Sequence, residues 1–377
     1  MSILLDGTQG IDFNDGSNQS TAATPYARKN LIINGDMNIA QRGTSATGKT
    51  TGGFYTVDRF WTGGVTAGTW TISQDTDTPS GQGFTTSLKM DCTTANASLS
   101  AGSYWYIEQK IEAQNCQHLK FGTSSAETLK VSFWVKSNKT GTYTFEIYRG
   151  DSGRDLSNTY TIDTADTWEK KTITINADST GVINNDNGEG LRCIFWVVAG
   201  TTFTSGTLAT SWEAINNANR VSSSNVNLAD STSNYINITG VQLEVNDSAS
   251  DFEFVPYDME LARCKRYYSR LSHDASGQIN IANLTCFTTT QAYGAFIFPV
   301  EMRSSPSIDI GAAGDFCITA KGANYTCTNV AGAVSSKYSS QIAGIVASGL
   351  TVGQACWLRF LGSTVDLNEY IEFDAEL

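Results

Sequence analysis

The sequence predicts an all-β protein: a jelly-roll β-sandwich with a short N-terminal attachment segment, one linking α-helix and a smaller C-terminal β domain. Two observations support this prediction. Only 16% of the 377 residues are charged and 34 are glycine; Ser, Thr and Asn are abundant, and glycine and asparagine supply turns while threonine favours strands. Short apolar runs with strand-like alternation also recur between polar turns. A chain of this length can form two or three domains.

Residues 1–29 form a separate segment in this prediction. Two short strand signals, Ile3–Leu5 and Ile11–Phe13, are separated by turn residues. The segment is too small to bury a core alone. The pattern Gly-Ile-x-Phe-x-Asp-Gly-Ser at residues 10–17 resembles the short N-terminal repeats of phage fibres. This resemblance implies an attachment or trimerisation segment, and the alternative is an unstructured tail.

Residues 30–256 carry the strand signals of the predicted sandwich. In Leu129–Val135 every odd position is apolar and Lys130 and Ser132 lie between them, as in a strand with one buried and one wet face. About eight such signals in some 200 residues fit a jelly roll. They are Leu31–Ile33, Trp70–Ile72, Tyr104–Ile107, Leu129–Val135, Tyr143–Tyr148, Lys171–Ile175, Leu191–Val198 and Tyr235–Ile238, which continues into Ile238–Val245.

A single clear helix is predicted over residues 257–272. Pro256 lies just before it, and an acidic start followed by a basic middle matches the helix dipole. One stripe of this helix collects four side chains: Leu261, Cys264, Tyr268 and Leu271. The stripe is expected either to line the axis of a trimer or to pack on the sandwich. His273 is expected to complement the C-terminal end of the helix dipole.

Residues 273–377 are predicted to form the smaller β domain. Its strand signals are Ile279–Ile281, Ala295–Phe298, Ser307–Ile310, Trp357–Leu361 and Tyr370–Phe373. The stretch 322–349 is rich in Gly and Ala, and its pattern assigns no element.

The most distinctive stretch runs from Ile238 to Tyr268. It joins a Gln-Leu-Glu strand, a polar turn, Phe252–Pro256 and a helix with the pattern Glu-Leu-x-x-Cys-x-Arg-Tyr-Tyr. Eight shorter motifs elsewhere in the chain also contribute to the resemblance stated below. They are Asn30–Met37, Gln41–Gly43, Val57–Trp61, Ile107–Glu112, Ser132–Lys136, Thr167–Lys170, Phe298–Arg303 and Ile371–Leu377. Together they resemble landmarks of the tail-fibre and virion-appendage proteins of bacteriophages, whose sandwich is similar to the jelly rolls of carbohydrate-binding modules.

This resemblance implies a homotrimer that joins other virion or tail proteins through residues 1–29 and binds a glycan on the host surface. It also implies assembly in the host cytoplasm, residence in the virion, and no enzyme activity. The alternative is a structural virion decoration or adaptor without a host ligand, whose tip should lack an exposed aromatic cluster. A third class, a glycan depolymerase, requires two close carboxylates in a groove.

Composition argues against several functions. The net charge is −12, and no basic stripe suits a phosphate backbone, so no nucleic-acid partner is expected. No apolar run is long enough for membrane insertion. The eight cysteines form no CxxC pair. Because Ile3–Leu5 is too short for a secretion signal, we expect buried free thiols rather than disulfides.

The segment Gly43–Thr50 matches the phosphate-binding pattern GxxxxGKT. A genuine loop of this kind follows a buried strand and opens a helix, whereas here the lead-in is polar and Thr51-Gly-Gly-Phe follows. A surface loop between strands is therefore predicted. No cofactor is expected, except that Asn34, Asp36 and Asp58 are candidate ligands of a structural calcium ion.

Aromatic side chains are the candidate ligand-binding residues, because sugar faces stack on rings whose polar edges stay wet. Trp134 and Trp196 lie inside apolar runs and are expected in the core. Six others lie nearer turns or wet faces and are the candidates: Trp61, Trp70, Trp105, Tyr148, Trp212 and Tyr325. Core packing remains the alternative for each of them.

Overall fold

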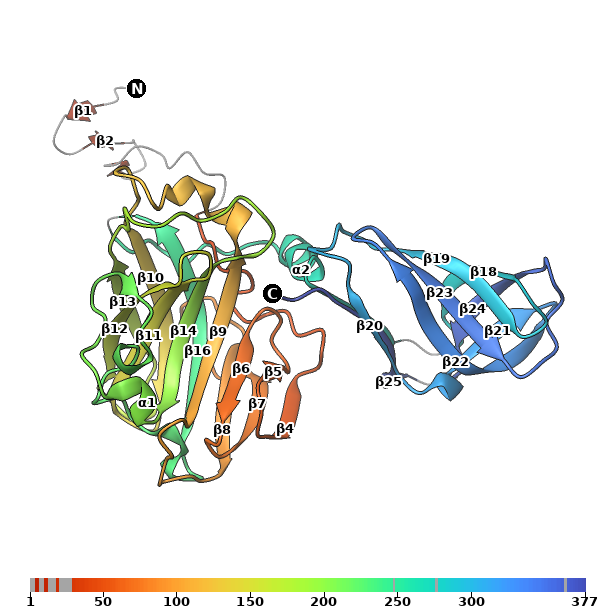
Figure 1. Ribbon diagram of the computed structural model, residues 1–377, viewed down its shortest axis with the longest axis horizontal. Coiled ribbons are helices and arrows are strands. Elements are labelled where there is room, and N and C mark those ends of the chain that lie inside the picture. The colour runs from red at the N-terminus through yellow and green to blue at the C-terminus, as the bar shows by residue number, and fades with distance from the viewer. Residues whose placement is uncertain are drawn as a thin grey trace.

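The computed structural model describes residues 4–6, 10–12, 18–19 and 29–377, apart from 247, 275–276 and 363–364. Within these residues the chain forms two β bodies joined through a short helix (Figure 1). The larger body is a sandwich of two antiparallel sheets, and the smaller contains a closed barrel. The predicted all-β fold class is confirmed.

The sandwich consists of a six-stranded and a seven-stranded sheet. The six-stranded sheet has the order β13 (Glu169–Ile175), β10 (Leu129–Ser137), β16 (Tyr235–Val245), β8 (Ser87–Thr94), β7 (Thr69–Asp75) and β4 (Ser45–Lys49). The seven-stranded sheet has the order β15 (Glu213–Ala214), β12 (Arg154–Ile162), β11 (Gly141–Arg149), β14 (Glu189–Ala199), β9 (Tyr104–Glu112), β6 (Trp61–Val65) and β5 (Gly53–Phe54). Short helical turns lie between strands: η1 (Ala113–Leu119), α1 (Thr201–Thr204), η2 (Asn217–Asn219) and η3 (Leu228–Asp230).

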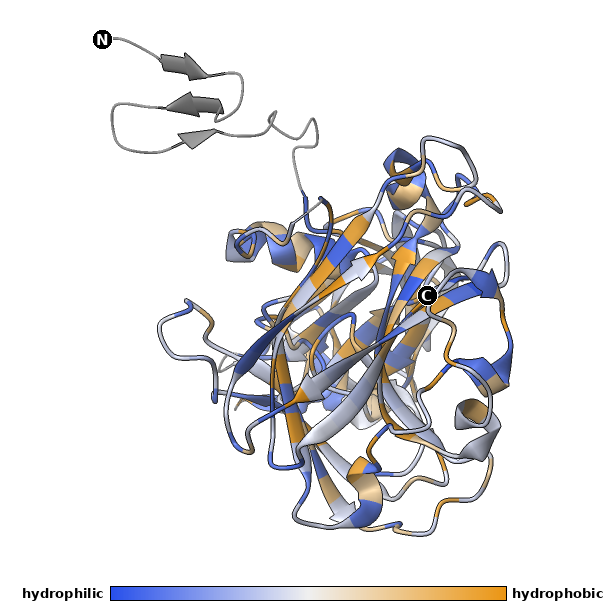
Figure 2. Ribbon diagram, turned by 90° about the vertical axis from the view of Figure 1, so that its left-hand side faces the viewer, coloured by the Kyte–Doolittle hydropathy of each residue, from blue (hydrophilic) through white to orange (hydrophobic). Residues whose placement is uncertain are grey.

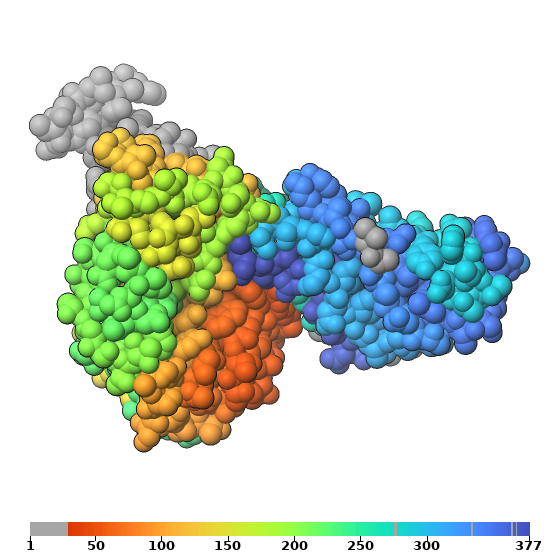
Figure 3. Space-filling model, in the orientation of Figure 1, coloured from red at the N-terminus to blue at the C-terminus, as the bar shows by residue number. Residues whose placement is uncertain are grey.

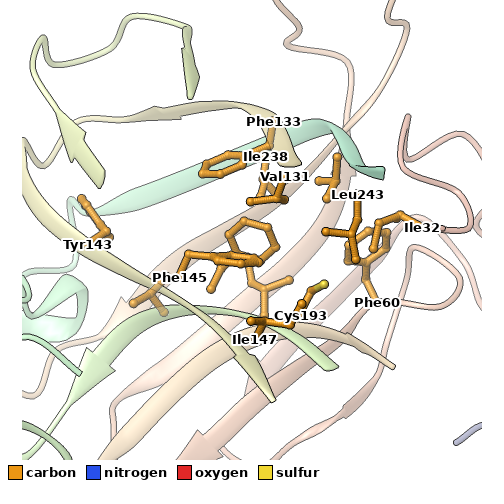
Figure 4. Packing of buried hydrophobic residues seen from close by; sticks show 14 of the residues in the cluster. Ile32, Phe60, Val131, Phe133, Tyr143, Phe145, Ile147, Cys193, Ile238 and Leu243 are labelled. Atoms are coloured by element: carbon orange, nitrogen blue, oxygen red, sulfur yellow. The ribbon is translucent and has the colours of Figure 1, made fainter. Parts of the chain in front are cut away.

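The inner faces of the two sheets form one hydrophobic core. Val131 and Phe133 of β10 point toward Phe145 and Ile147 of β11, as Figure 4 shows. Apolar and polar residues alternate along many strands (Figure 2), which is the period-two pattern of a sheet with one buried face. The predicted alternation in Leu129–Val135 therefore identified the inner face correctly.

The barrel has six antiparallel strands. Their order around it is β18 (Asn280–Cys286), β19 (Gln291–Ile297), β23 (Ser339–Val346), β22 (Ala323–Ser335), β21 (Phe316–Ala320) and β24 (Ala355–Phe360). A three-stranded sheet, β17 (Tyr268–His273), β25 (Asp366–Asp374) and β20 (Ser307–Ile310), adjoins it, and the turn η4 (Ala313–Asp315) leads into β21. Strands β22 and β23 fill the stretch 322–349, which the sequence left unassigned.

The predicted helix is too long. Helix α2 spans Tyr257–Lys265 and starts after Pro256 as expected, but β17 begins at Tyr268 and pairs with β25. Backbone pairing with a distant strand thus overrides local helix preference. Leu261 and Cys264 pack against Ile33 and Ile39 beside the sandwich.

Two further local predictions need correction. His273 does not end a helix: it is buried in β17, its Nδ1 bonds Glu369 at 2.8 Å and its Nε2 bonds Gly277 O at 2.7 Å. Leu31–Ile33 is a loop and not a strand; Ile32 and Ile33 are buried and Leu31 is partly buried. The side chain of Gln109 accepts from Ile33 N and donates to Ile33 O, which replaces strand pairing.

Near the N-terminus the chain forms a small antiparallel sheet of β1 (Leu4–Asp6), β2 (Gly10–Asp12) and β3 (Asn18–Gln19). The strand signals expected at Ile3–Leu5 and Ile11–Phe13 overlap β1 and β2, while Ile3 and Phe13 lie outside the described residues. The role of this segment, and the predicted division at residues 29, 256 and 272, remain predictions.

A polar junction fixes the barrel body on the sandwich. The guanidinium of Arg42 lies 3.4 Å from the ring centroid of Tyr268, and that of Arg59 lies 3.4 Å from that of Tyr267. Both arginines also pair with Glu376. Two of the sequence landmarks, Gln41–Gly43 and Val57–Trp61, thus owe part of their pattern to this junction.

Candidate functional site

Three aromatic side chains lie on the outer surface of the barrel, on or beside adjacent strands. Phe287 is 69% exposed, Trp357 is 45% exposed and Tyr293 is partly exposed. Trp357 of β24 is the register partner of Asn283 on β18, and Thr285 of β18 is the partner of Tyr293 on β19. We call these five residues the barrel strip.

The strip has the dimensions of a short oligosaccharide. Phe287 comes four residues after Asn283, so the strip extends about 13 Å along β18 at about 3.3 Å per residue. The rings of Phe287 and Tyr293 meet edge to face at 5.6 Å between centroids. Exposed ring faces can stack on the apolar faces of sugars, while the amide and hydroxyl groups between them can hydrogen-bond sugar hydroxyls.

The surroundings of the strip are almost uncharged. Strands β18, β19 and β24 carry a single charged side chain, Arg359, whose Nη2 donates to Gln278 O at 2.7 Å. A neutral ligand placed there would not desolvate an unpaired charge, which would be costly.

A shallow groove continues the strip across β19 and β23. Its volume is about 420 Å³, and it is lined by Tyr293, Gly294, Ala295, Ser339, Ser340 and Gln341. Gly294 keeps the strands close, because a Cβ there would lie 2.1 Å from Asn283 O. Tyr293 therefore borders both the strip and the groove.

The strip rests on a tightly packed layer. Alternate residues of the same strands, Leu284, Cys286, Cys356 and Leu358, are all buried. The Sγ atoms of Cys286 and Cys356 are 3.5 Å apart, and burial, followed by the interaction of the two thiols, raises the pKa of Cys356 to about 12. All eight cysteines are free and buried, as expected. A packed base of this kind holds surface side chains in place.

The sequence missed this strip, although a signal for it was present. Cys356, Leu358 and Phe360 alternate as inward residues, so a period-two count places Trp357 outward. On β18, Leu284 and Cys286 point inward, so the same alternation places Thr285 on the outer surface of the barrel. Phe287, two residues further along, is then expected on the outer surface as well.

Two of the six aromatic candidates chosen from the sequence are wrong. Trp70 and Trp105 are completely buried, and their ring centroids lie 5.6 Å apart. Trp70 donates to Ala67 O at 2.9 Å. Both tryptophans occupy inward positions of β7 and β9, so neither presents a ring face to a ligand.

The other sandwich candidates are partly buried and engaged in packing. Trp61 lies 5.2 Å from Tyr106 between ring centroids, and a Cβ on Gly52 would meet its ring at 1.7 Å. Trp212 donates to Asn176 O at 2.7 Å. The Tyr148 ring lies 5.4 Å from the guanidinium of Arg192.

Tyr325 is the only sequence candidate on the barrel. It packs partly buried against the barrel core, and a Cβ on Gly349 would lie 2.5 Å from its ring. The structure therefore does not bring the six candidates together, and it places none of them in the barrel strip.

The outer face of the seven-stranded sheet carries an ion-pair network. Glu146 accepts from Trp196 Nε1 at 2.7 Å and from Arg220 Nε at 2.9 Å. Burial raises the pKa of Glu146. Burial, followed by the nearby charge of Glu146, raises the pKa of Asp155 to about 7. Asp155 is fully buried, and within the described chain neither carboxylate oxygen has a partner from another residue.

The candidate calcium ligands are engaged with protein groups. Asn34 donates from Nδ2 to Ile39 O and Asp58 O, and its Oδ1 accepts from Ile39 N. Asp58 accepts two hydrogen bonds from Gln41, and Asp36 accepts one from Asn38. In the part of the chain that the structure describes, no three His, Cys, Asp or Glu side chains are placed to hold a metal ion. Calcium at this position remains a prediction.

The phosphate-loop pattern Gly43–Thr50 lies on the sandwich surface. It forms β4, an edge strand paired with β7, where a loop was predicted. No helix follows it: after Thr50 the chain passes directly to β5. Among the described residues, no helix is long and apolar enough to span a membrane.

Comparisons with known proteins show only distant likenesses. The sequence matches no protein-family model and no curated protein. Similar structures include the enzymatically active domain of tailspike protein 4 of bacteriophage CBA120, at 14% identity and TM-score 0.30, over 58% of this chain and 21% of that one. They also include TmCBM61 in complex with β-1,4-galactotriose, at 11% identity and TM-score 0.29, over 58% of this chain and all of that one. The family 11 carbohydrate-binding module of cellulase Lic26A-Cel5E of Clostridium thermocellum aligns at 13% identity and TM-score 0.27, over 53% and 96%. Likenesses this distant support no function for this chain.

Proposed function

We propose that this protein is a bacteriophage appendage protein that binds a glycan on the host cell surface through the barrel strip. The single observation that carries the proposal is the exposed aromatic cluster of Phe287, Tyr293 and Trp357 in uncharged surroundings. The sequence motifs that resemble phage fibre landmarks supply the biological setting.

In this proposal the sandwich is the scaffold and the barrel is the recognition part. The protein acts as a homotrimer, and residues 1–29 join it to other virion proteins. One shallow strip binds weakly, but three strips in a trimer and several fibres on a virion multiply the effective affinity. The protein binds its glycan and does not cleave it.

The alternative function is a structural decoration or adaptor with no host ligand. That function predicts a tip without an exposed aromatic cluster, whereas Phe287 and Trp357 are exposed on the barrel. The exposed cluster on the barrel therefore favours the adhesin over the structural protein.

The proposal is tested by binding to cells. Purified full-length protein is incubated with a panel of bacterial strains that a related phage infects, and both co-sedimentation and inhibition of phage adsorption are measured. Saturable binding that blocks adsorption is expected. A folded protein that ignores every strain and leaves adsorption unchanged would leave the structural role in its place.

Variants connect the binding to the strip. Trp357→Ala and Phe287→Ala should each weaken binding about ten-fold, since an aromatic stacking contact plus its buried area is worth roughly 1–2 kcal/mol. Tyr257→Ala is the matched control, because Tyr257 is 63% exposed but lies on α2. Equal loss in all three variants would contradict a role specific to the strip.

A further inference from the structure

A second site candidate lies where the sandwich, helix α2 and the barrel body meet. A cleft of about 960 Å³ opens there, within the size range of small-molecule sites. One wall is formed by β9, η1 and the loop before β14, and the other by α2 and by loops of the barrel body. In Figure 3 the two bodies meet along a narrow waist at this level.

The cleft is cationic although the chain is acidic. Its lining includes five cationic side chains, Lys110, Arg263, Arg266, Arg303 and Lys337. Two acidic side chains, Asp186 and Glu301, also line it. Three of the cations pair with carboxylates just outside the lining, Lys110 with Glu189, Arg263 with Glu260 and Arg266 with Glu112, while the whole chain carries a net charge of −12. A concentration of positive charge in a concave site attracts anions.

Two of these cations, Arg266 and Arg303, are occupied by hydrogen bonds within the protein. Arg303 donates from Nε to Ala375 O, from Nη1 to Asn187 O and from Nη2 to Glu376 O. Arg266 forms a bidentate pair with Glu112, at 2.7 and 2.9 Å. The Arg303 contacts join Asn187 of the sandwich to the C-terminal residues after β25, and the Arg266 pair joins the chain after α2 to β9.

Two other cations retain binding capacity. Within the described chain, the guanidinium of Arg263 uses only Nη1, which donates to Glu260 at 2.9 Å. Its other N–H groups remain for a ligand. Lys337 pairs with Glu301, but both side chains are more than 40% exposed, and an exposed pair of this kind is weak and easily exchanged. The exposed amide of Asn115 adds a neutral donor and acceptor on the opposite wall.

We propose that this cleft binds an anionic saccharide, a sugar that bears a carboxylate or a phosphate group. Arg263 and Lys337 hold the anionic group, and Asn115 contacts sugar hydroxyls from the sandwich side. The ligand thereby bridges the two bodies, and its binding stiffens their junction. This site is separate from the barrel strip, and its ligand class is charged where that of the strip is neutral.

The test is direct binding by titration calorimetry on the full-length protein. Three probes are compared: trigalacturonate, β-1,4-galactotriose as the neutral sugar, and inorganic phosphate. Trigalacturonate or phosphate should bind, and the affinity should fall as salt is raised, since screening weakens charge contacts at the surface. Trigalacturonate alone indicates a carboxylate ligand, and phosphate alone indicates a phosphorylated sugar.

Variants localise the binding. Arg263→Gln and Lys337→Gln should each weaken anion binding about ten-fold, the effect of losing one charge-assisted contact. Lys170→Gln is the control, because it removes the same charge from an exposed position on β13. Galactotriose binding does not depend on these two cations, so the outcome is independent of the barrel strip.

Three results would overturn the proposal: no anion binding at millimolar concentration, equal loss in Lys170→Gln, or unchanged anion binding in both cleft variants. Circular dichroism verifies that each variant is folded. Lys337→Gln keeps the test decisive if Arg263→Gln unfolds, because Lys337 lies in an exposed turn between β22 and β23.

Discussion

The barrel leaves large aromatic residues exposed, whereas the large aromatic residues in the strands of the sandwich are buried or partly buried. The sandwich buries Trp70, Trp105 and Trp196 completely, whereas the barrel leaves Trp357 and Phe287 45% and 69% exposed. Trp70 and Trp105 belong to the core between the two sheets, while Trp196 is covered on the outer face of the seven-stranded sheet in a cluster with Phe203 and Val221. A six-stranded barrel has a narrow interior, and much of its core consists of smaller side chains, among them Cys286, Ala292, Ala320, Cys327 and Cys356. Under the proposed function, the exposed aromatic residues of the barrel serve recognition, whereas the buried ones in both bodies, such as Trp105 and Phe316, serve stability.

The largest expected effect tests the sandwich half of this comparison. Trp105→Ala should lower the free energy of unfolding by about 3–5 kcal/mol, because it removes a fully buried ring and leaves a cavity. Urea denaturation of the full-length protein measures this loss. A loss below about 1 kcal/mol would show that Trp105 is not part of a packed core.

The next effect concerns the charged outer face of the sandwich. The pKa of Asp155 is about 7 in the folded protein and near 4 in an unfolded chain. At pH values between these two pKa values, Asp155 is more often protonated in the folded state than in the unfolded state. The free energy of unfolding therefore falls as the pH rises from about 4 to about 7. Asp155→Asn should remove this part of the pH dependence, which we expect to be roughly 1–3 kcal/mol.

Thermal unfolding between pH 5 and pH 8 compares wild type with this variant. Asp163→Asn is the control, since the Asp163 side chain is 70% exposed. If wild type and Asp155→Asn lose stability in parallel with rising pH, Asp155 is not the group responsible.

The smallest expected change in stability concerns the exposed tryptophan of the barrel. Trp357→Ala should change the free energy of unfolding by no more than about 1 kcal/mol, because nearly half of its surface already faces water. The same urea titration as for Trp105→Ala measures it. A loss comparable to that of Trp105→Ala would mean that Trp357 is a structural residue and not a recognition residue.

The sequence predicted the sandwich better than the barrel, and the reason is physical. Long strands with clear alternation, such as Leu129–Val135, report the side they bury. Strands β22 and β23 were missed because their Gly- and Ala-rich sequences supply little side-chain bulk, and barrel closure holds them. The predicted helix extended past Lys265 because the pairing of β17 with β25 depends on residues about 100 positions apart in the sequence.

The candidate site was harder to predict than the fold. Aromatic type alone does not distinguish Trp105, which is buried, from Trp357, which is exposed. The distinction depends on register, and a shift of one residue reverses the face of every side chain. The cationic cleft was not predictable at all, since α2, η1 and the turn around Lys337 meet only in the folded chain.

The most direct test of the central claim compares one ring from each body. Trp61→Ala on the sandwich and Trp357→Ala on the barrel are titrated in parallel, at equal concentrations of folded full-length protein, against the bacterial strain that wild type binds. The account predicts that Trp357→Ala weakens binding about ten-fold, while Trp61→Ala binds as wild type does. Loss of binding in Trp61→Ala with full binding in Trp357→Ala would contradict it and place recognition on the sandwich.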